Sequence, residues 1–176
     1  ISNYTMKDKL NNNLKFLKIA KYAAKKAGKV IKASFGKAIV AGTKSYHSDF
    51  LTETDKKCDE IICNIIKKNF PLHSIIAEES GKLINDSEYC WTIDPVDGTT
   101  NFVYNLHYVS VSIGLCYKGS AILGVVFNPI LNELFYAVKG HGAYCNGNKI
   151  FVTSEDDLEK SLLVTGFPYY RKDNPG

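Results

Sequence analysis

One short segment, Trp91 to Phe102, constrains this chain more than any other part of its sequence. An apolar, β-prone run from Cys90 to Ile93 comes directly before two aspartates, Asp94 and Asp97. The run predicts a buried strand that delivers Asp94 at its end, and Pro95 is expected to stop that strand. Because the φ angle of this proline is fixed, the two aspartates should lie one tight turn apart and face the same point.

Two carboxylates held together in this way need a cation. Carboxylate oxygens are hard ligands that suit Mg²⁺ or Mn²⁺ better than zinc, and no His or Cys stands nearby at ligand spacing. Gly98, Thr99 and Thr100 follow and predict the start of a helix, where free backbone N–H groups bind phosphate. An ordinary turn rich in aspartate explains most such strings, but the added strand, proline and Gly-Thr-Thr favour metal-assisted phosphoryl chemistry.

Two further acidic positions could join this site. Glu78 and Glu79 follow the short apolar run from Ser74 to Ala77, so a second strand could direct carboxylates to the same point as the first. Asp55 stands in the first turn of a predicted helix, where spacing alone favours simple capping of the helix.

The order of elements predicts an α+β fold in a single domain over residues 1–176. Apolar residues from Leu10 to Phe35 recur with helical period, and a second helix should begin at Thr54 or Asp55 and end before Pro71. Residues 38–54 suggest a hairpin or loop between these helices. After the aspartate segment, alternating residues and turn signals predict successive hairpins of an antiparallel sheet, then one or two helical turns over 154–160 and a strand at 162–165.

Composition narrows the class of protein further. The hydrophobic share of 45% and the charged share of 23% are those of a soluble globular protein, and no apolar run could span a membrane. The net charge of +4 is small and much of the lysine lies on the first helix, which indicates a solvated face and no nucleic-acid partner. The five cysteines lack a C-x-x-C pattern, and no secretory signal is recognisable at the N-terminus. We therefore expect reduced thiols and a cytoplasmic protein, or one of an organellar stroma if a leader has been removed.

The segment W-T-I-D-P-V-D-G-T-T-N-F resembles the signature of the inositol monophosphatase family, a group of Mg²⁺-dependent, lithium-sensitive phosphatases. The resemblance extends over nearly the whole chain. It includes Lys44, the string from Asp49 to Asp55, and the pair Glu78-Glu79, which follows Ala77 where the family commonly has glycine. The implied fold is a layered α/β/α/β/α sandwich, of which this chain would supply the first helical layer and the larger antiparallel sheet.

The resemblance also implies a role for each residue of the site. Glu78, Asp94 and the carbonyl of Val96 would hold one metal ion, and Asp94 and Asp97 would contribute to a second. Two or three Mg²⁺ ions are expected, with Mn²⁺ as a substitute. Glu78, Thr99 and Asp55 would orient and deprotonate the attacking water, and Lys44 would lie near an outer metal position. The implied substrate-binding set is Glu78, Val96, Asp97, Gly98 and Thr99, with Glu79 as a further member of the acidic pair.

One departure from the family pattern bears on activity. Family members carry a further metal-binding Asp in a W-D motif well downstream, whereas the single tryptophan here is Trp91. We therefore expect this chain to be the N-terminal part of a longer phosphatase, inactive by itself. The expected reaction is hydrolysis of an inositol monophosphate, a small phosphorylated metabolite, by a homodimer. Histidinol phosphate, fructose 1,6-bisphosphate and 3′-phosphoadenosine 5′-phosphate are alternative substrates, and a non-catalytic protein- or RNA-binding module is the alternative of another class.

Overall fold

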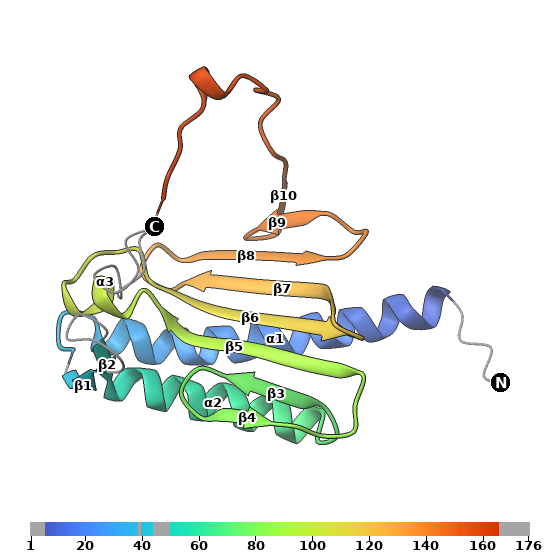
Figure 1. The fold of residues 1–176 in the computed structure, drawn as a ribbon, viewed down its shortest axis with the longest axis horizontal. Helices are drawn as coiled ribbons and strands as arrows, with labels where there is room; N and C mark the ends of the chain where they lie inside the picture. Colours follow the sequence, from blue (N-terminus) through green and yellow to red (C-terminus); the bar gives the residue numbers. More distant parts are fainter. Residues whose placement is uncertain (1–5, 39, 44–49, 166–176) are drawn as a thin grey trace, which may run out of the picture.

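Two long helices cover one face of an eight-stranded sheet (Figure 1). The computed structural model describes residues 6–38, 40–43 and 50–165. The first helix, α1, spans Met6–Ser34, and the second, α2, spans Glu53–Asn69. The arrangement confirms the predicted α+β class, with a helical layer built from the chain up to Asn69 and the main sheet from the part that follows.

The helices pack closely because α1 presents small side chains to its neighbours. Ala20, Ala23, Ala24 and Ala27 have no exposed surface, and they recur at the spacing that places residues on one face of a helix. The facing stripe of α2 includes Ile62 and Ile66, which are also fully buried. The apolar stripes that the sequence predicts are therefore the ones that form the core.

The main sheet has the strand order β10-β9-β8-β7-β6-β5-β3-β4. Neighbouring strands run antiparallel except β3 and β5, which are parallel. A separate two-stranded sheet pairs β1 with β2 and lies between the two helices in the chain. The bounds are β1 Val40–Thr43, β2 Phe50–Thr52, β3 Ser74–Ala77, β4 Gly81–Leu83, β5 Tyr89–Asp97, β6 Ser110–Tyr117, β7 Ser120–Asn128, β8 Glu133–Val138, β9 Ala143–Cys145 and β10 Asn148–Ile150.

The structure corrects two expectations about strands. β5 continues through Pro95 to Asp97, and its pairing with β6 is irregular between Asp94 and Asp97. A proline is accommodated there because the interrupted ladder does not require its missing N–H group. Residues 162–165 form no strand, and the preceding segment contains only a short 3₁₀ turn, Leu158–Lys160.

An aromatic cluster lies beneath one end of β5. The fully buried Trp91 ring packs against Phe16 of α1, Phe70 at the end of α2, and His73. Tyr89 stacks on His73 with ring centroids 4.7 Å apart. This cluster fixes β5 against both helices, and so fixes the strand that carries Asp94. No helix in the described part of the chain is long and apolar enough to cross a membrane.

Candidate active site

Glu78 and Asp94 are brought together by the one parallel strand pair. Ala77 of β3 is in register with Ile93 of β5, and the Glu78 amide donates a hydrogen bond of 3.1 Å to the Ile93 carbonyl. The next residue along each strand is one of the two acids. The sequence prediction that two neighbouring strand ends direct carboxylates to one place is therefore confirmed.

The Asp94 carboxyl lies in an unfavourable environment for a charge. Burial raises its pKa to about 8, and the nearby carboxyls of Glu78 and Asp97 contribute to the rise. A hydrogen bond between the side chains of Glu78 and Asp94 adds to this rise. They line a cavity of about 290 Å³ together with Thr92 and with Ser112 of β6.

Asp97 lies at the end of β5 and is exposed. The hydroxyl of Ser110 is 3.4 Å from its Oδ2 atom and donates a long hydrogen bond to it. Asp97 is close enough to Asp94 to raise the pKa of that carboxyl. The two aspartates thus influence each other, as their spacing predicts, although only Asp94 lines the cavity.

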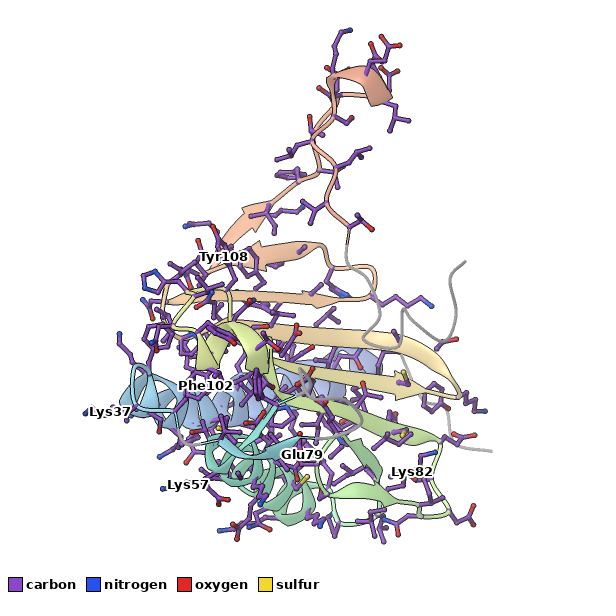
Figure 2. The ribbon with its side chains drawn as sticks, turned by 60° about the vertical axis from the view of Figure 1, so that its left-hand side comes forward. Lys37, Lys57, Glu79, Lys82, Phe102 and Tyr108 are labelled. Atoms are coloured by element: carbon purple, nitrogen blue, oxygen red, sulfur yellow. The ribbon has the colours of Figure 1, made fainter. Side chains whose placement is uncertain are left out.

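Gly98 turns the chain from β5 into a short helix, α3, which spans Thr99–Val103. Its φ angle is +88°, in the left-handed region, and a Cβ atom added there would lie 2.8 Å from the Tyr108 carbonyl oxygen. Phe102 is fully buried and points from α3 into the protein near the end of α1, where it contacts Phe35 (Figure 2). The turn at Gly98 and the buried side chain of Phe102 together place Thr99 directly after the end of β5 that carries the two aspartates.

Gly98→Ala is expected to destabilise the protein by about 1–3 kcal/mol, because the new side chain meets backbone in a conformation that L residues rarely adopt. Urea unfolding followed by circular dichroism measures the loss. Gly119→Ala is the matched control, since Gly119 also has a positive φ of 75° but has open space around its Cβ position. Equal losses in the two variants would show that the close contact with Tyr108 has no energetic weight.

A buried hydrogen-bond network joins Thr99 to the start of α2. The Thr99 hydroxyl lies 2.8 Å from Oδ1 of Asp55 and 3.0 Å from the Val96 carbonyl oxygen. The backbone amide of Thr52 donates to Oδ2 of Asp55 over 2.9 Å, and the Thr52 hydroxyl donates to the same oxygen. Asp55 therefore both caps α2 and receives the Thr99 hydroxyl, so the capping role and the site role coexist in one residue.

Thr52, which lies in the string from Asp49 to Asp55, is the network member that was not assigned a role in the site from the sequence. The spacing T-x-x-D at the start of a helix is the signal that could have found it, because a capping box pairs these two positions. Ser112 was also missed, since it reaches the cavity only through the pairing of β5 with β6.

Glu79 lies away from its neighbour Glu78. It lines a second cavity, of about 280 Å³, with Asp59 and Cys63 of α2, and Figure 2 shows it between α2 and β3. The structure thus separates the adjacent glutamates into one that lies beside Asp94 and one that faces the helix. Lys44 and Asp49 lie outside the described residues.

The donor set at the strand ends fits a hard divalent cation. Burial of Asp94 raises its pKa, and the carboxyls of Glu78 and Asp97 both lie close enough to raise it further. A cation of charge +2 would remove this penalty, and carboxylate oxygens are the ligands that Mg²⁺ and Mn²⁺ prefer. Among the described residues, however, no group of three or more His, Cys, Asp or Glu side chains is arranged so that it could hold a metal ion.

Comparisons with known proteins agree with this picture. The family model "Inositol monophosphatase family" matches residues 12–175. The chain is 45% identical over 154 residues to inositol monophosphatase 3 of Solanum lycopersicum, covering 85% of this chain and 57% of the relative. It is 46% identical over 155 residues to the Nus factor SuhB of Pasteurella multocida, covering 87% of this chain and 58% of the relative. The chain thus spans a little under three fifths of the length of these relatives.

Solved structures show the same fold. The inositol monophosphatase of Anabaena superposes with a TM-score of 0.81 at 42% identity, covering 93% of this chain and 60% of that one. A structure described as IMPase/NADP phosphatase complexed with Mg²⁺ and phosphate superposes with a TM-score of 0.70 at 28% identity, covering 78% of this chain and 53% of that one.

Proposed function

Because the chain belongs to the inositol monophosphatase family, we propose that the protein it forms part of is a Mg²⁺-dependent phosphatase that hydrolyses an inositol monophosphate. The observation that carries the proposal is the position of Asp94, a partly buried carboxyl of raised pKa beside Glu78 and Asp97. Because this environment disfavours the ionised carboxylate when no cation is present, a bound cation would stabilise it. The homodimer implied by the family resemblance and the cytoplasmic location expected from the cysteine content and the N-terminal sequence stay predictions.

The acidic residues would hold the metal ions. Glu78, Asp94 and the Val96 carbonyl would bind the first ion, and Asp94 and Asp97 would contribute to the second. The Val96 carbonyl oxygen already lies near the Thr99 hydroxyl, and its second lone pair leaves room for a further partner. When bound, the ions supply positive charge to the phosphate oxygens and lower the pKa of water. The Mg²⁺ and phosphate named for the IMPase/NADP phosphatase support this assignment.

Thr99 and Asp55 would handle the proton of the attacking water. Oδ1 of Asp55 accepts the Thr99 hydroxyl hydrogen, so the lone pairs of Thr99 Oγ1 are free to accept a hydrogen bond from water. Thr52 occupies the other carboxylate oxygen and so keeps Oδ1 directed at Thr99. Gly98 and Thr99 would receive the phosphate at the start of α3. Glu78 would help to orient the same water from the end of β3.

Thr99→Val is expected to lower kcat by about 10²–10³-fold, since it removes the hydroxyl and leaves the buried Asp55 without one of its donors. Thr99→Ser keeps the hydroxyl and should retain most of the activity. Steady-state kinetics of the full-length protein with inositol 1-phosphate measures both. If the valine variant raised KM alone, Thr99 would be a binding residue without a role in the proton transfer.

Phosphate release by the full-length protein tests the function itself. Inositol 1-phosphate is expected to be hydrolysed when Mg²⁺ is present and not when EDTA replaces it. Histidinol phosphate, fructose 1,6-bisphosphate and 3′-phosphoadenosine 5′-phosphate, assayed in parallel, decide the substrate. The absence of Mg²⁺-dependent turnover with any of these four phosphate esters would contradict the proposal.

The similarity to the Nus factor SuhB supports a second candidate, a non-catalytic role in binding protein or RNA. The exposed face of α1 carries Lys15, Lys18, Lys25 and Lys29, which could contact an anionic partner. The two functions use different residues. Lys25→Glu with Lys29→Glu should therefore leave phosphate release unchanged while weakening such a partner, and a large loss of phosphatase activity in this variant would argue against separate functions.

A further inference from the structure

A second cavity, of about 440 Å³, lies between α1 and the strands at one edge of the main sheet. It opens on the sheet face that the helices cover, where β8, β9 and β10 extend beyond α1 (Figure 1). Its lining includes two lysines of α1, two residues of β8 and one asparagine from each of two turns: Lys21, Lys25, Leu134, Tyr136, Asn132 and Asn146. We propose that this cavity binds a small anion that carries phosphate groups, such as pyrophosphate or a nucleoside diphosphate. The proposal is independent of the phosphatase function.

The helix side of the cavity is positively charged. Lys21 and Lys25 are four residues apart on α1, so their side chains lie on the same face of the helix. Neither lysine forms an ion pair with any residue that the structure describes, and α1 contains no Asp or Glu after Asp8. Like charges at this spacing repel each other. A bound anion would therefore remove a repulsion that nothing on the helix itself offsets.

The sheet side of the cavity adds no carboxylate. Tyr136 lies opposite Tyr144 of β9, and the two rings stack with their centroids 5.3 Å apart. Lys149 of β10 lies opposite Tyr144 and so stands on the same face of the sheet. Glu133, the acid of β8, alternates with Leu134, which is buried toward the helices, so Glu133 is directed to the other face. This edge of the sheet therefore adds a third lysine to the two on α1.

Hydrogen bonds of Asn146 fix the wall opposite the lysines. Its backbone amide donates to the Leu134 carbonyl over 2.9 Å, and its Oδ1 atom accepts from the Leu134 amide over 3.0 Å. Its Nδ2 atom donates to the Asn132 carbonyl over 3.0 Å. The turn between β7 and β8 is thus joined to the turn between β9 and β10. Because this wall is held in place without a ligand, binding would not have to order it.

The chemistry of the lining favours phosphate groups. The Lys21 ammonium lies 3.8 Å from the centroid of the Tyr136 ring, which holds this charge over the sheet at the cavity. A lysine ammonium is a compact charge with three N–H donors, and it is a common ligand of phosphate oxygens. The apolar side chains of Phe127 and Leu134 also line the cavity and could contact a base or sugar ring. The volume lies within the range of roughly 300–1,000 Å³ that is usual for small-molecule sites.

Isothermal titration calorimetry of the full-length protein with pyrophosphate in EDTA tests the proposal. The candidate active site should not interfere, because β8 is three strands away from β5, or roughly 14 Å, and EDTA removes the metal ions on which that site would depend. Saturable binding is expected, and Lys21→Gln and Lys25→Gln should each weaken it by about tenfold. Both variants should keep the phosphatase activity of the wild type.

Lys29→Gln is the matched control, because Lys29 is an exposed residue of α1 that does not line the cavity and the variant loses the same charge. Its affinity for pyrophosphate should equal that of the wild type. A loss as large as in Lys25→Gln would show a general attraction between the helix and anions, which would overturn the proposal. Binding that Asp94→Asn changes and the lysine variants do not would place the anion in the active site and would overturn it as well.

Acetylation of lysines by an N-hydroxysuccinimide ester, mapped by mass spectrometry, locates the anion directly. Pyrophosphate should slow the modification of Lys21 and Lys25 and leave that of Lys29 unchanged. ADP, assayed in parallel, should protect the same two lysines, and tighter binding than that of pyrophosphate would add a contact between its base and the cavity. The proposal would be overturned if neither anion bound saturably at millimolar concentration, or if Lys21 and Lys25 reacted equally fast with and without pyrophosphate.

Discussion

Asp94→Asn is expected to stabilise the metal-free protein at neutral pH by about 1–2 kcal/mol, although it removes a central residue of the proposed site. In the folded protein burial and the neighbouring carboxyls raise the pKa of Asp94 from 3.8 to about 8. The folded state therefore binds more protons than the unfolded state between about pH 4 and pH 8, and the free energy of unfolding falls as pH rises through that window. Asparagine carries no charge, can still accept from the Val96 amide, and can donate to Glu78.

Urea unfolding in EDTA at pH 5 and pH 8 measures this effect. The wild type should lose stability between the two values, while Asp94→Asn should lose less. Asp86→Asn is the control, because Asp86 is exposed in the loop before β5 and changes charge in the same way. Equal pH dependence in all three proteins would show that Asp94 has no unfavourable environment.

Trp91→Ala is expected to cost about 3–5 kcal/mol of stability, the largest loss among the predicted variants. Trp91 has no exposed surface and contacts Phe16, Phe70 and His73. Its indole N–H donates a hydrogen bond of 3.1 Å to Nδ1 of His73, and this nitrogen must be unprotonated to accept it. Burial lowers the pKa of His73 and so favours the neutral ring. Removing the indole leaves a cavity beneath β5 and takes away the hydrogen-bond donor of the half-buried His73.

Circular dichroism should follow this unfolding, since Trp91 is the single tryptophan of the given chain and its loss removes the tryptophan fluorescence that reports on this cluster. Trp91→Phe keeps most of the volume and should cost less than half as much. A loss below about 1 kcal/mol for the alanine variant would mean that the aromatic cluster does not hold β5 in place.

The helices and most of the sheet could be predicted because their patterns are local. The alanine and isoleucine stripes of α1 and α2 are readable at helical spacing, and the Asn146-Gly147 turn marks its hairpin. The continuation of β5 through Pro95 could not be read, because it depends on an irregularity in the pairing with β6. The parallel pairing of β3 with β5 could not be predicted either, because it depends on the order of the strands in the sheet.

The candidate site likewise combines features that local sequence patterns predict with features that depend on the folded chain. The proximity of Glu78 and Asp94 followed from two apolar runs that end in acids, and the start of α3 followed from Gly-Thr-Thr. The sequence could not predict that Glu79, and not Glu78, faces α2, because the two residues are identical and adjacent. The turn after β3 decides their orientation. The link from Asp55 to Thr99 joins residues 44 positions apart and needs the folded chain.

The most direct test of the central claim is divalent-cation binding at the ends of β3 and β5. Mn²⁺ binding to the full-length protein, followed by electron paramagnetic resonance, should be saturable, competed by Mg²⁺ and weakened at least tenfold by Asp94→Asn. Asp86→Asn should bind as the wild type does. Unchanged Mn²⁺ affinity in Asp94→Asn would contradict the account, because the carboxyls gathered at these strand ends would then not be the metal site.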